Sequence, residues 1–132
     1  MALQSEASKN IFNMPKDTFH FFDDGTVNGR EVVNFLGLKK KEVAAATNVN
    51  QQSIRYDNKI PAELKERLIE WAIAINLAGS YFQDRDKTIL WLQTPNELLG
   101  DLSPRDMIRL GRFKKLHKFI KNALKDNMKD MA

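Results

Sequence analysis

The chain of 132 residues is predicted to be an all-α protein, and three kinds of observation predict this. Apolar residues recur at steps of three and four along 64–78 and again along 113–124, which is the period of a helix with one buried face. Helix-start and helix-stop residues bracket several shorter segments. Strand-like sequence is confined to the aromatic stretch 19–22, which the Asp-Asp-Gly at 23–25 closes as a turn.

Length and composition limit the protein to one or two small helical units. A chain of 15.2 kDa hides roughly two-thirds of its unfolded surface. The sequence has no cysteine, which excludes a disulfide framework and a thiolate metal site and is consistent with a reducing cytosol. Residues 1–10 lack the features of a secretory signal, and no apolar run reaches the ~18 residues of a membrane span. A cytoplasmic protein without membrane contact is expected.

The net charge of +4 is concentrated at the C-terminal end. Residues 105–132 hold nine Lys or Arg against three Asp, whereas residues 61–104 hold four basic against seven acidic residues. The basic segment could meet phosphate or an acidic protein surface. The alternative is a solvated helix face with no partner.

Residues 1–27 show no helical period and are expected to form an N-terminal arm. His20 lies near Asp23 and Asp24 in the sequence, but one His with two turn carboxylates lacks the number and spacing of metal ligands. We therefore expect no metal site and no cofactor.

A first short helix is predicted from Asn28. Asn28 can cap this helix with Glu31 at its third position, which is the capping-box arrangement, and Gly37 can end it. Its apolar face consists of Val32, Val33 and Leu36.

A second helix, a turn and a third helix are predicted next. The second helix is expected near 40–47, and Asn48 stands where the turn requires a left-handed backbone, which Asn tolerates next best after Gly. Asn50 can cap the third helix and Ile54 can anchor it in the core. The residues of the third helix that are candidates for DNA binding are Asn50, Gln51, Gln52, Ser53, Arg55 and Tyr56.

This spacing resembles the helix-turn-helix of the Xre/Cro type. Ala44 is the small residue where the two helices cross, the turn residue follows four positions later, and Ile54 is the aliphatic core residue six beyond it. The string NQQSI at 50–54 is also similar to the start of the recognition helix of a lambdoid phage repressor. Because a Gln amide can donate and accept together, Gln51 and Gln52 suit the adenine edge in the major groove.

Two positions depart from the helix-turn-helix pattern. Lys39 stands where a capping Ser or Thr is usual, and Tyr56 replaces a polar residue that often completes base contacts. The alternative is a helical hairpin that only packs against the rest of the chain.

A long helix is predicted from after Pro61 to about Phe82, and it is expected to link the two halves of the chain. Its apolar residues fall at steps of three and four: Leu64, Leu68, Trp71, Ala72, Ile75 and Ala78.

Two short helices with the same kind of start are predicted between 94 and 111. Thr94 can cap the first, with Pro95 at its first helical position, and Gly100 ends it. The pair Ser103-Pro104 repeats this start for the second helix. Its inward apolar residues are expected to be Met107 and Leu110, and Gly111 is expected to end it.

The last helix is predicted from Arg112 to about Leu124. Its inward residues are Phe113, Leu116, Ile120 and Leu124, and its outward residues are Arg112, Lys114, Lys115, Lys118 and Lys121.

The block 81–104 resembles the toxin-binding domain of the Xre/MbcA/ParS antitoxin family. The recurring elements of that domain stand here as Tyr81-Phe82-Gln83-Asp84, Trp91-Leu92, Pro95-Asn96, Leu99-Gly100 and Ser103-Pro104. Together with the helix-turn-helix, the resemblance covers about residues 28–124. Asp101 stands where the family often has a second Gly, and Trp91, Leu92 and Leu99 are expected in the core rather than in a contact surface.

The resemblance implies an all-α fold in which an N-terminal Xre/Cro-like helix-turn-helix is joined by a long helix to a small C-terminal helical toxin-binding domain. The expected division is an arm at 1–27, the helix-turn-helix at 28–60, and the toxin-binding and dimerisation domain at 61–132. Separate caps and separate apolar faces in the two halves predict that residues 60–132 bind the toxin on their own.

The implied function is that of an antitoxin in a type II toxin–antitoxin system. Such a protein is expected to be a homodimer that neutralises a cognate toxin, of the NAD-consuming RES type, and to repress its own operon by binding operator DNA on the nucleoid. It is not expected to be an enzyme, and no catalytic residues are predicted. The candidate toxin-binding residues are Arg105, Arg109, Arg112, Lys115 and Lys118.

Two other functions fit the same sequence. A phage-type or orphan transcription regulator would use the second domain for dimerisation only. An interaction adaptor would keep the helical fold but would have lost the reading of DNA.

Overall fold

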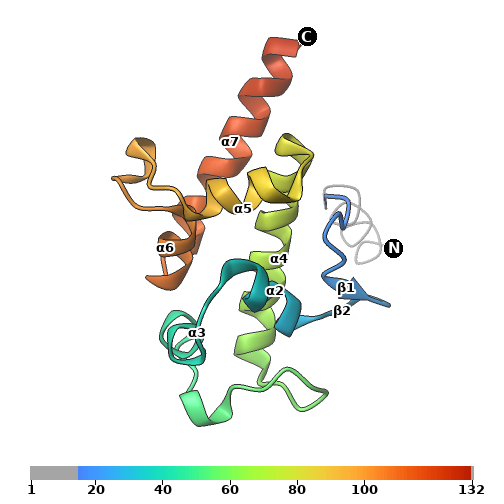
Figure 1. The fold of residues 1–132 in the computed structure, drawn as a ribbon. Coiled ribbons are helices and arrows are strands. Elements are labelled where there is room, and N and C mark those ends of the chain that lie inside the picture. The colour runs from blue at the N-terminus through green and yellow to red at the C-terminus, as the bar shows by residue number, and fades with distance from the viewer. Residues whose placement is uncertain (1–14, 132) are drawn as a thin grey trace, which may run out of the picture.

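The computed structural model describes residues 15–131, with side chains as far as residue 126. The predicted all-α class is confirmed, because the described part consists of helices and one very short hairpin (Figure 1). The elements in chain order are β1 (Phe22–Asp23), β2 (Thr26–Val27), α2 (Gly29–Leu36), α3 (Lys40–Thr47), the 3-10 turn η1 (Gln51–Ser53), α4 (Ala62–Phe82), α5 (Arg85–Gln93), the 3-10 turn η2 (Glu97–Leu99), α6 (Pro104–Arg109) and α7 (Phe113–Met131).

Helix α4 runs through the middle of the molecule and packs against α2, α5 and α7 (Figure 1). All six of its predicted apolar residues are buried, and Ala74, Asn76 and Gly79 are buried with them. Because α4 is buried on most of its circumference in its second half, it serves as the central helix of the fold and not as an exposed linker.

One hydrophobic core includes residues from both sides of the predicted boundary at residue 60. Its buried cluster runs from Phe21 through Val43 and Ile54 to Leu92 and Ile120. The boundary therefore separates two predicted functions but does not separate two cores.

Residues 15–27 pack on this core and do not form a free arm. The predicted extended piece closed by a turn is confirmed as a hairpin in which Phe22 pairs with Val27. Phe21 is almost fully buried and its ring lies edge-on to that of Phe35, with 5.5 Å between centroids. Residues 1–14 of the predicted arm lie outside the described residues.

Asp17 and Asn76 hold this hairpin against α4. The Asp17 carboxylate accepts from the backbone N–H groups of Phe21 and Phe22, at 2.8 and 3.0 Å. The buried Asn76 amide donates to Asp17 Oδ1 at 3.1 Å and accepts from the N–H of Phe19 at 3.4 Å. This network satisfies polar groups that would otherwise be buried without partners.

The ends of α2 follow the sequence with one exception. Asn28 accepts from the N–H of Glu31 at 3.3 Å, and Gly37 ends the helix in the left-handed conformation with φ 67°. The reciprocal capping-box bond is not among the hydrogen bonds of the described residues, since the Asn28 N–H donates to the carbonyl of Phe21 at 2.6 Å. The Asn28 N–H group, which the Glu31 side chain was expected to bind, therefore donates instead to the residue directly before the hairpin.

Two predictions between residues 94 and 111 were wrong in detail. Thr94 ends α5 with its hydroxyl donating to the Leu90 carbonyl, and Asn96 caps the following turn η2 by accepting from the Leu98 N–H. Leu110 was expected inward, but it follows the last residue of α6 and is 46% exposed. Because Leu110 lies beyond the helical part, the i,i+3 spacing from Met107 does not place it on the buried face of α6.

The predicted start of α6 is confirmed. Ser103 accepts from the N–H of Asp106 at 3.0 Å, and Pro104 occupies the first helical position. Gly100 and Gly111 both take the left-handed conformation expected of residues that end a helix. Helix α7 continues to Met131, well beyond the predicted end near Leu124, and projects from the body of the molecule (Figure 1).

Candidate DNA-binding and partner-binding surfaces

The predicted third helix is a single 3-10 turn. Asn50 caps η1 as expected, accepting from the N–H of Gln52 at 3.0 Å, and Ile54 is buried as expected. Ile54 has an extended backbone, however, so the helix ends there. Asp57 accepts from the Lys59 N–H at 3.0 Å and pairs with Arg55, and such local bonds compete with continuation of a helix.

The second helix and the turn that precede η1 form as the sequence predicted. Asn48 is left-handed with φ 59°, and Val43 of α3 is fully buried. Lys39 cannot accept a capping bond, but its N–H donates to the Glu42 carboxylate at 2.8 Å, which starts α3 without a Ser or Thr. The departure at Lys39 is therefore compensated within the same turn.

The predicted DNA-binding residues fall into two groups. Gln51, Gln52 and Ser53 are exposed on η1 and make no side-chain hydrogen bond in the described part of the chain. Tyr56 is half-buried under the Arg30 guanidinium, 5.5 Å from its ring centroid, and burial raises the pKa of its hydroxyl while Arg30 lowers it. Arg55 is tied to Asp57, whereas the predicted DNA-binding side chains of Gln51, Gln52 and Ser53 on η1 are exposed.

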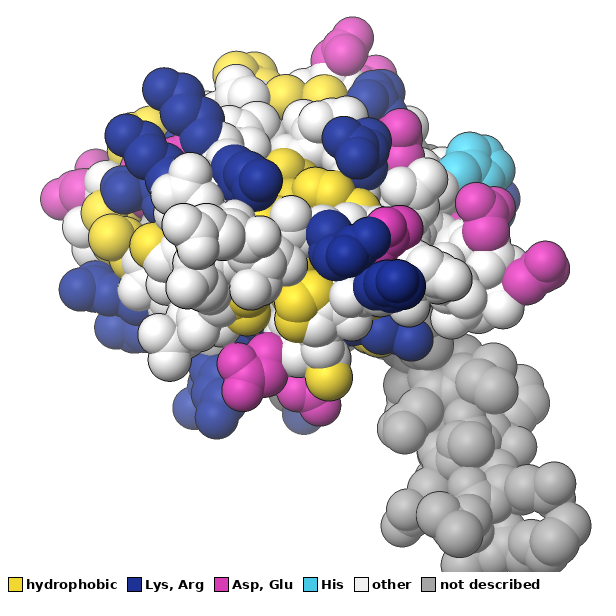
Figure 2. All heavy atoms as spheres, turned by 90° about the horizontal axis from the view of Figure 1, so that it is seen from below, with side chains coloured by type: hydrophobic (Ala, Val, Ile, Leu, Met, Phe, Trp, Pro, Cys, Tyr) yellow, Lys and Arg dark blue, Asp and Glu magenta, His cyan; other side chains and the backbone are white. Residues whose placement is uncertain are grey.

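An open hollow of about 620 Å³ lies beside η1 and is lined in part by Arg30, Lys40 and Arg55. Three cations therefore lie next to the predicted DNA-binding residues of η1. Figure 2 looks at the molecule from below, and on this face basic side chains stand in several separate groups with acidic side chains between some of them. The charge does not merge into one broad basic patch.

Arg105 and Arg109 lie at the junction of α6 with the turn between α2 and α3. Arg105 donates from Nε to the carbonyl of Leu36 and from Nη2 to the carbonyl of Gly37, both at 2.8 Å. Arg109 lies 3.2 Å from Asp106 and 3.9 Å from Glu42. Arg105 therefore closes the C-terminal end of α2, and Arg109 joins α6 to Glu42 of α3, besides the toxin contact that the sequence predicted for both.

The other candidate toxin-binding residues lie on α7 or directly before it, and they are exposed. Arg112, Lys115 and Lys118 face solvent, as do Lys114 and Lys121. On the same helix His117 stacks on Phe113, with 5.4 Å between ring centroids. Burial and then the nearby Lys121 lower the pKa of His117, and Glu70 opposes this shift.

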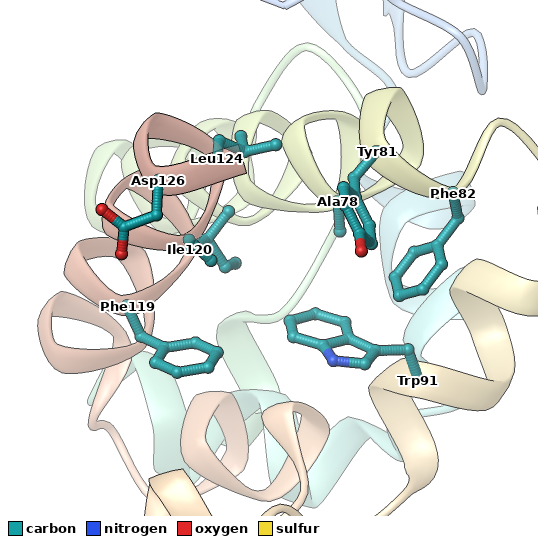
Figure 3. Close-up of a pocket in the computed structure, with 9 residues that line it drawn as sticks. Ala78, Tyr81, Phe82, Trp91, Phe119, Ile120, Leu124 and Asp126 are labelled. Carbon is teal, nitrogen blue, oxygen red and sulfur yellow. The ribbon is translucent and has the colours of Figure 1, made fainter. Parts of the chain in front are cut away.

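Of the three residues expected in the core of the second block, Leu92 and Leu99 are buried. Trp91 is only half-buried, because its ring forms one wall of a groove. Figure 3 shows the rings of Trp91 and Phe119 on opposite sides of this opening, with Tyr81 and Phe82 above. The groove has a volume of about 300 Å³. We call it the aromatic groove; it is lined by Ala78, Tyr81, Phe82, Trp91, Phe119, Ile120, Ala123, Leu124 and Asp126.

Sequence reasoning missed Phe119 and Tyr81 as candidate contact residues. Tyr81 is 54% exposed, and Phe119 lies one position off the buried strip of Leu116 and Ile120. An aromatic residue just off the buried strip of an amphipathic helix is the signal that could have indicated a second apolar surface.

The described residues contain no group of three His, Cys, Asp or Glu side chains that could hold a metal ion. No helix within the same part of the chain is both long and apolar enough to cross a membrane.

No known protein-family model matches this chain, and no curated protein matches it. Among solved structures, a chain from the crystal structure of the MbcT-MbcA toxin-antitoxin complex of M. tuberculosis is similar to it, with a TM-score of 0.44. The two are 24% identical, and the match covers 71% of this chain and 87% of that chain. A likeness this distant places the chain in no family and assigns it no partner, so the function rests on the chain's own residues.

Proposed function

We propose that this chain is an antitoxin that binds and neutralises a cognate toxin in the cytoplasm. The observation that carries the proposal is the aromatic groove. One side of it is formed by the basic helix α7, and the other includes Tyr81, Phe82 and Trp91 of the block that resembles an antitoxin's toxin-binding domain. An apolar hollow with polar and charged edges is the usual form of a protein-binding surface.

Three structural features of that block support the proposal. Asn96 caps η2, Gly100 ends it in a left-handed conformation, and Ser103 caps α6, so these three residues of the block each have a conformational task. Asn96 and Gly100 hold the two ends of η2, on which Leu98 is 78% exposed. A large apolar residue on a turn with fixed ends is a typical anchor for a partner.

The proposed partner is a RES-type toxin that consumes NAD, and the antitoxin would act by covering the entrance to its active site. This mode of action needs no chemistry from the antitoxin itself. Co-expression tests it directly: the product of the adjacent gene should arrest growth alone, and this chain should restore growth and co-purify with that product. If the adjacent product is harmless, or if this chain does not bind it, the proposal is wrong.

Binding of operator DNA as a homodimer is the second part of the proposal. It is supported by the exposed glutamines on η1, by the left-handed turn at Asn48, and by the cations at the neighbouring hollow. The short third element favours the adaptor alternative, because one 3-10 turn offers fewer side chains to the major groove than a full recognition helix. Footprinting on the promoter upstream of this gene distinguishes the two.

A further inference from the structure

Two adjoining hollows lie along one side of α7, and they share no lining residue with the aromatic groove. The first, of about 460 Å³, is bounded by α3, α4, α6 and the start of α7, and the second, of about 350 Å³, lies between α4 and α7. Among the described residues that line them, Glu70 is the only acidic one. The basic residues of the two linings are Arg67, Arg112, Lys114, Lys115, Lys118 and Lys121.

Five of these six cations are not neutralised inside the described part of the chain. Glu70 pairs with Arg67, and the salt bridges among the described residues involve none of the other five. We call these five exposed residues the basic face of α7; they are Arg112, Lys114, Lys115, Lys118 and Lys121.

The spacing of the basic face is unfavourable for the isolated helix. Lys114, Lys118 and Lys121 follow one another at steps of four and three, so like charges are neighbours on one side of α7. At a rise of 1.5 Å per residue, these three ammonium groups are spread over about 10 Å. A bound polyanion relieves their mutual repulsion, and a duplex carries one negative charge per about 1.7 Å of its axis.

The two hollows lack the exposed apolar anchors that usually hold a protein partner. The large apolar residues that are exposed in the described chain line neither hollow; they are Tyr81, Leu90, Leu98 and Leu110. Trp71 and Phe113, the aromatic residues of the linings apart from His117, are buried in the core. Because Lys and Arg bind a phosphate backbone through charge without such anchors, this composition favours nucleic acid over an acidic protein surface.

The first hollow adjoins the predicted DNA-binding turn. Ala46 of α3 lines this hollow, and η1 follows α3 after three residues. Figure 1 shows α3, α6 and the start of α7 on the same side of α4. A duplex that meets η1 would therefore have the basic face of α7 beside its backbone.

We propose that the basic face of α7 binds the sugar-phosphate backbone of duplex DNA, next to the bases that η1 is proposed to meet. The inference rests on the proposed operator binding and adds to it a surface that binds DNA of any sequence. It reassigns Arg112, Lys115 and Lys118 from the predicted toxin contact to DNA.

The double variant Lys114→Gln, Lys115→Gln tests the proposal against the control Lys16→Gln, Lys87→Gln. Each variant removes two positive charges from exposed positions, and the control sites lie before the hairpin and on the first turn of α5. Binding to the promoter fragment upstream of the gene, and to a scrambled duplex of equal length, is measured by fluorescence anisotropy across a range of salt concentrations.

We expect the α7 double variant to weaken binding to both duplexes at least fivefold at about 0.1 M salt. The slope of log K against log salt should become shallower by about two, because two phosphate contacts are lost. The control should change affinity less than about twofold and should keep the slope of the parent. Gln51→Ala, in contrast, should weaken binding to the promoter fragment only.

Circular dichroism establishes that both double variants fold like the parent. An unchanged slope in the α7 double variant would show that the basic face does not contact phosphates, while operator binding would stand. Equal effects of the two double variants would show a general charge effect and would also overturn the proposal. If the parent binds neither duplex, the basic face and operator binding both fall. If the parent binds both duplexes equally and the α7 double variant loses both, the basic face stands and base reading falls.

An acidic surface of the toxin is the competing occupant. Association of the α7 double variant with the product of the adjacent gene should match that of the parent. If that association slows while the binding of both duplexes is unchanged, the basic face meets an acidic protein surface and the proposal is wrong.

Discussion

At the scale of single residues, Asn76 is a polar side chain in the most apolar part of the protein. It is 1% exposed on α4, and its amide joins Asp17 to the backbone of Phe19. Asn76→Ala leaves the Asp17 carboxylate and the Phe19 N–H with one partner fewer and should lower the free energy of unfolding by about 1–3 kcal/mol. Urea unfolding measures this loss. Asn34→Ala, at an exposed position of α2, should change stability by less than about 0.5 kcal/mol, and an equal loss in both variants would contradict this role.

His117 is predicted to make the stability of the protein depend on pH in the acidic range. The pKa of His117 lies below its ordinary value of 6.5 in the folded chain, chiefly because the ring is partly buried. The unfolded chain therefore binds the proton more readily, and stability should fall as the pH drops below about 6.5 toward the folded pKa. Above about pH 7 the ring is neutral in both states and contributes no pH dependence.

Urea midpoints at about pH 7.5 and pH 5.5 measure this effect of His117. His117→Gln should reduce the loss of stability between the two conditions. His20→Gln, which changes an exposed histidine on the hairpin segment, should leave the loss as it is in the parent. The same loss in the parent and in His117→Gln would show that other groups cause it.

At the scale of elements, the short η1 limits the proposed reading of DNA. Gln51 and Gln52 lie on a single 3-10 turn. If one of them loses a base contact, few neighbouring side chains can replace that contact. Gln51→Ala or Gln52→Ala should cost about 1–3 kcal/mol of operator affinity and should relax the preference at one or two base pairs. Toxin binding should remain unchanged, because the aromatic groove is formed by other elements.

Gln93→Ala is the control for these variants, since Gln93 is exposed at the end of α5. Promoter footprinting at a fixed salt concentration compares the three proteins. If the glutamine variants bind the promoter as well as the parent does, Gln51 and Gln52 do not read bases. If the parent gives no footprint, the adaptor alternative replaces operator binding.

At the scale of the whole molecule, the shared core changes what a truncation should do. The sequence predicted that residues 60–132 act alone, but α4 packs against α2 and the hairpin strand β2 as well as against α5 and α7. The residues before 60 contribute buried apolar side chains to the same cluster: Phe21, Val27, Val32, Val33, Phe35, Leu36, Leu38, Val43 and Ile54. Burying each is worth about 1.5–3 kcal/mol, so losing several exceeds the total stability of about 5–15 kcal/mol typical of a domain.

We therefore expect residues 60–132 to lose cooperative unfolding and to bind the toxin weakly or not at all. Thermal unfolding followed by circular dichroism checks this, with the full chain as the reference. A fragment that unfolds in a sharp transition and binds the toxin like the full chain would show that the second half carries its own core.

The sequence alone determined the all-α class, the length of α4, and most helix ends, including those at Asn28, Gly37 and Ser103. These features depend on contacts within about four residues, which the order of residues specifies directly. The tertiary structure decided the rest. It showed that η1 is one turn, that Asp17 and Asn76 dock the hairpin, that Arg105 closes the end of α2, and that Trp91 faces Phe119 across a groove. Three of these features are contacts between residues far apart in the chain, and the length of η1 depends on the residues around it. No local sequence pattern predicts features of either kind.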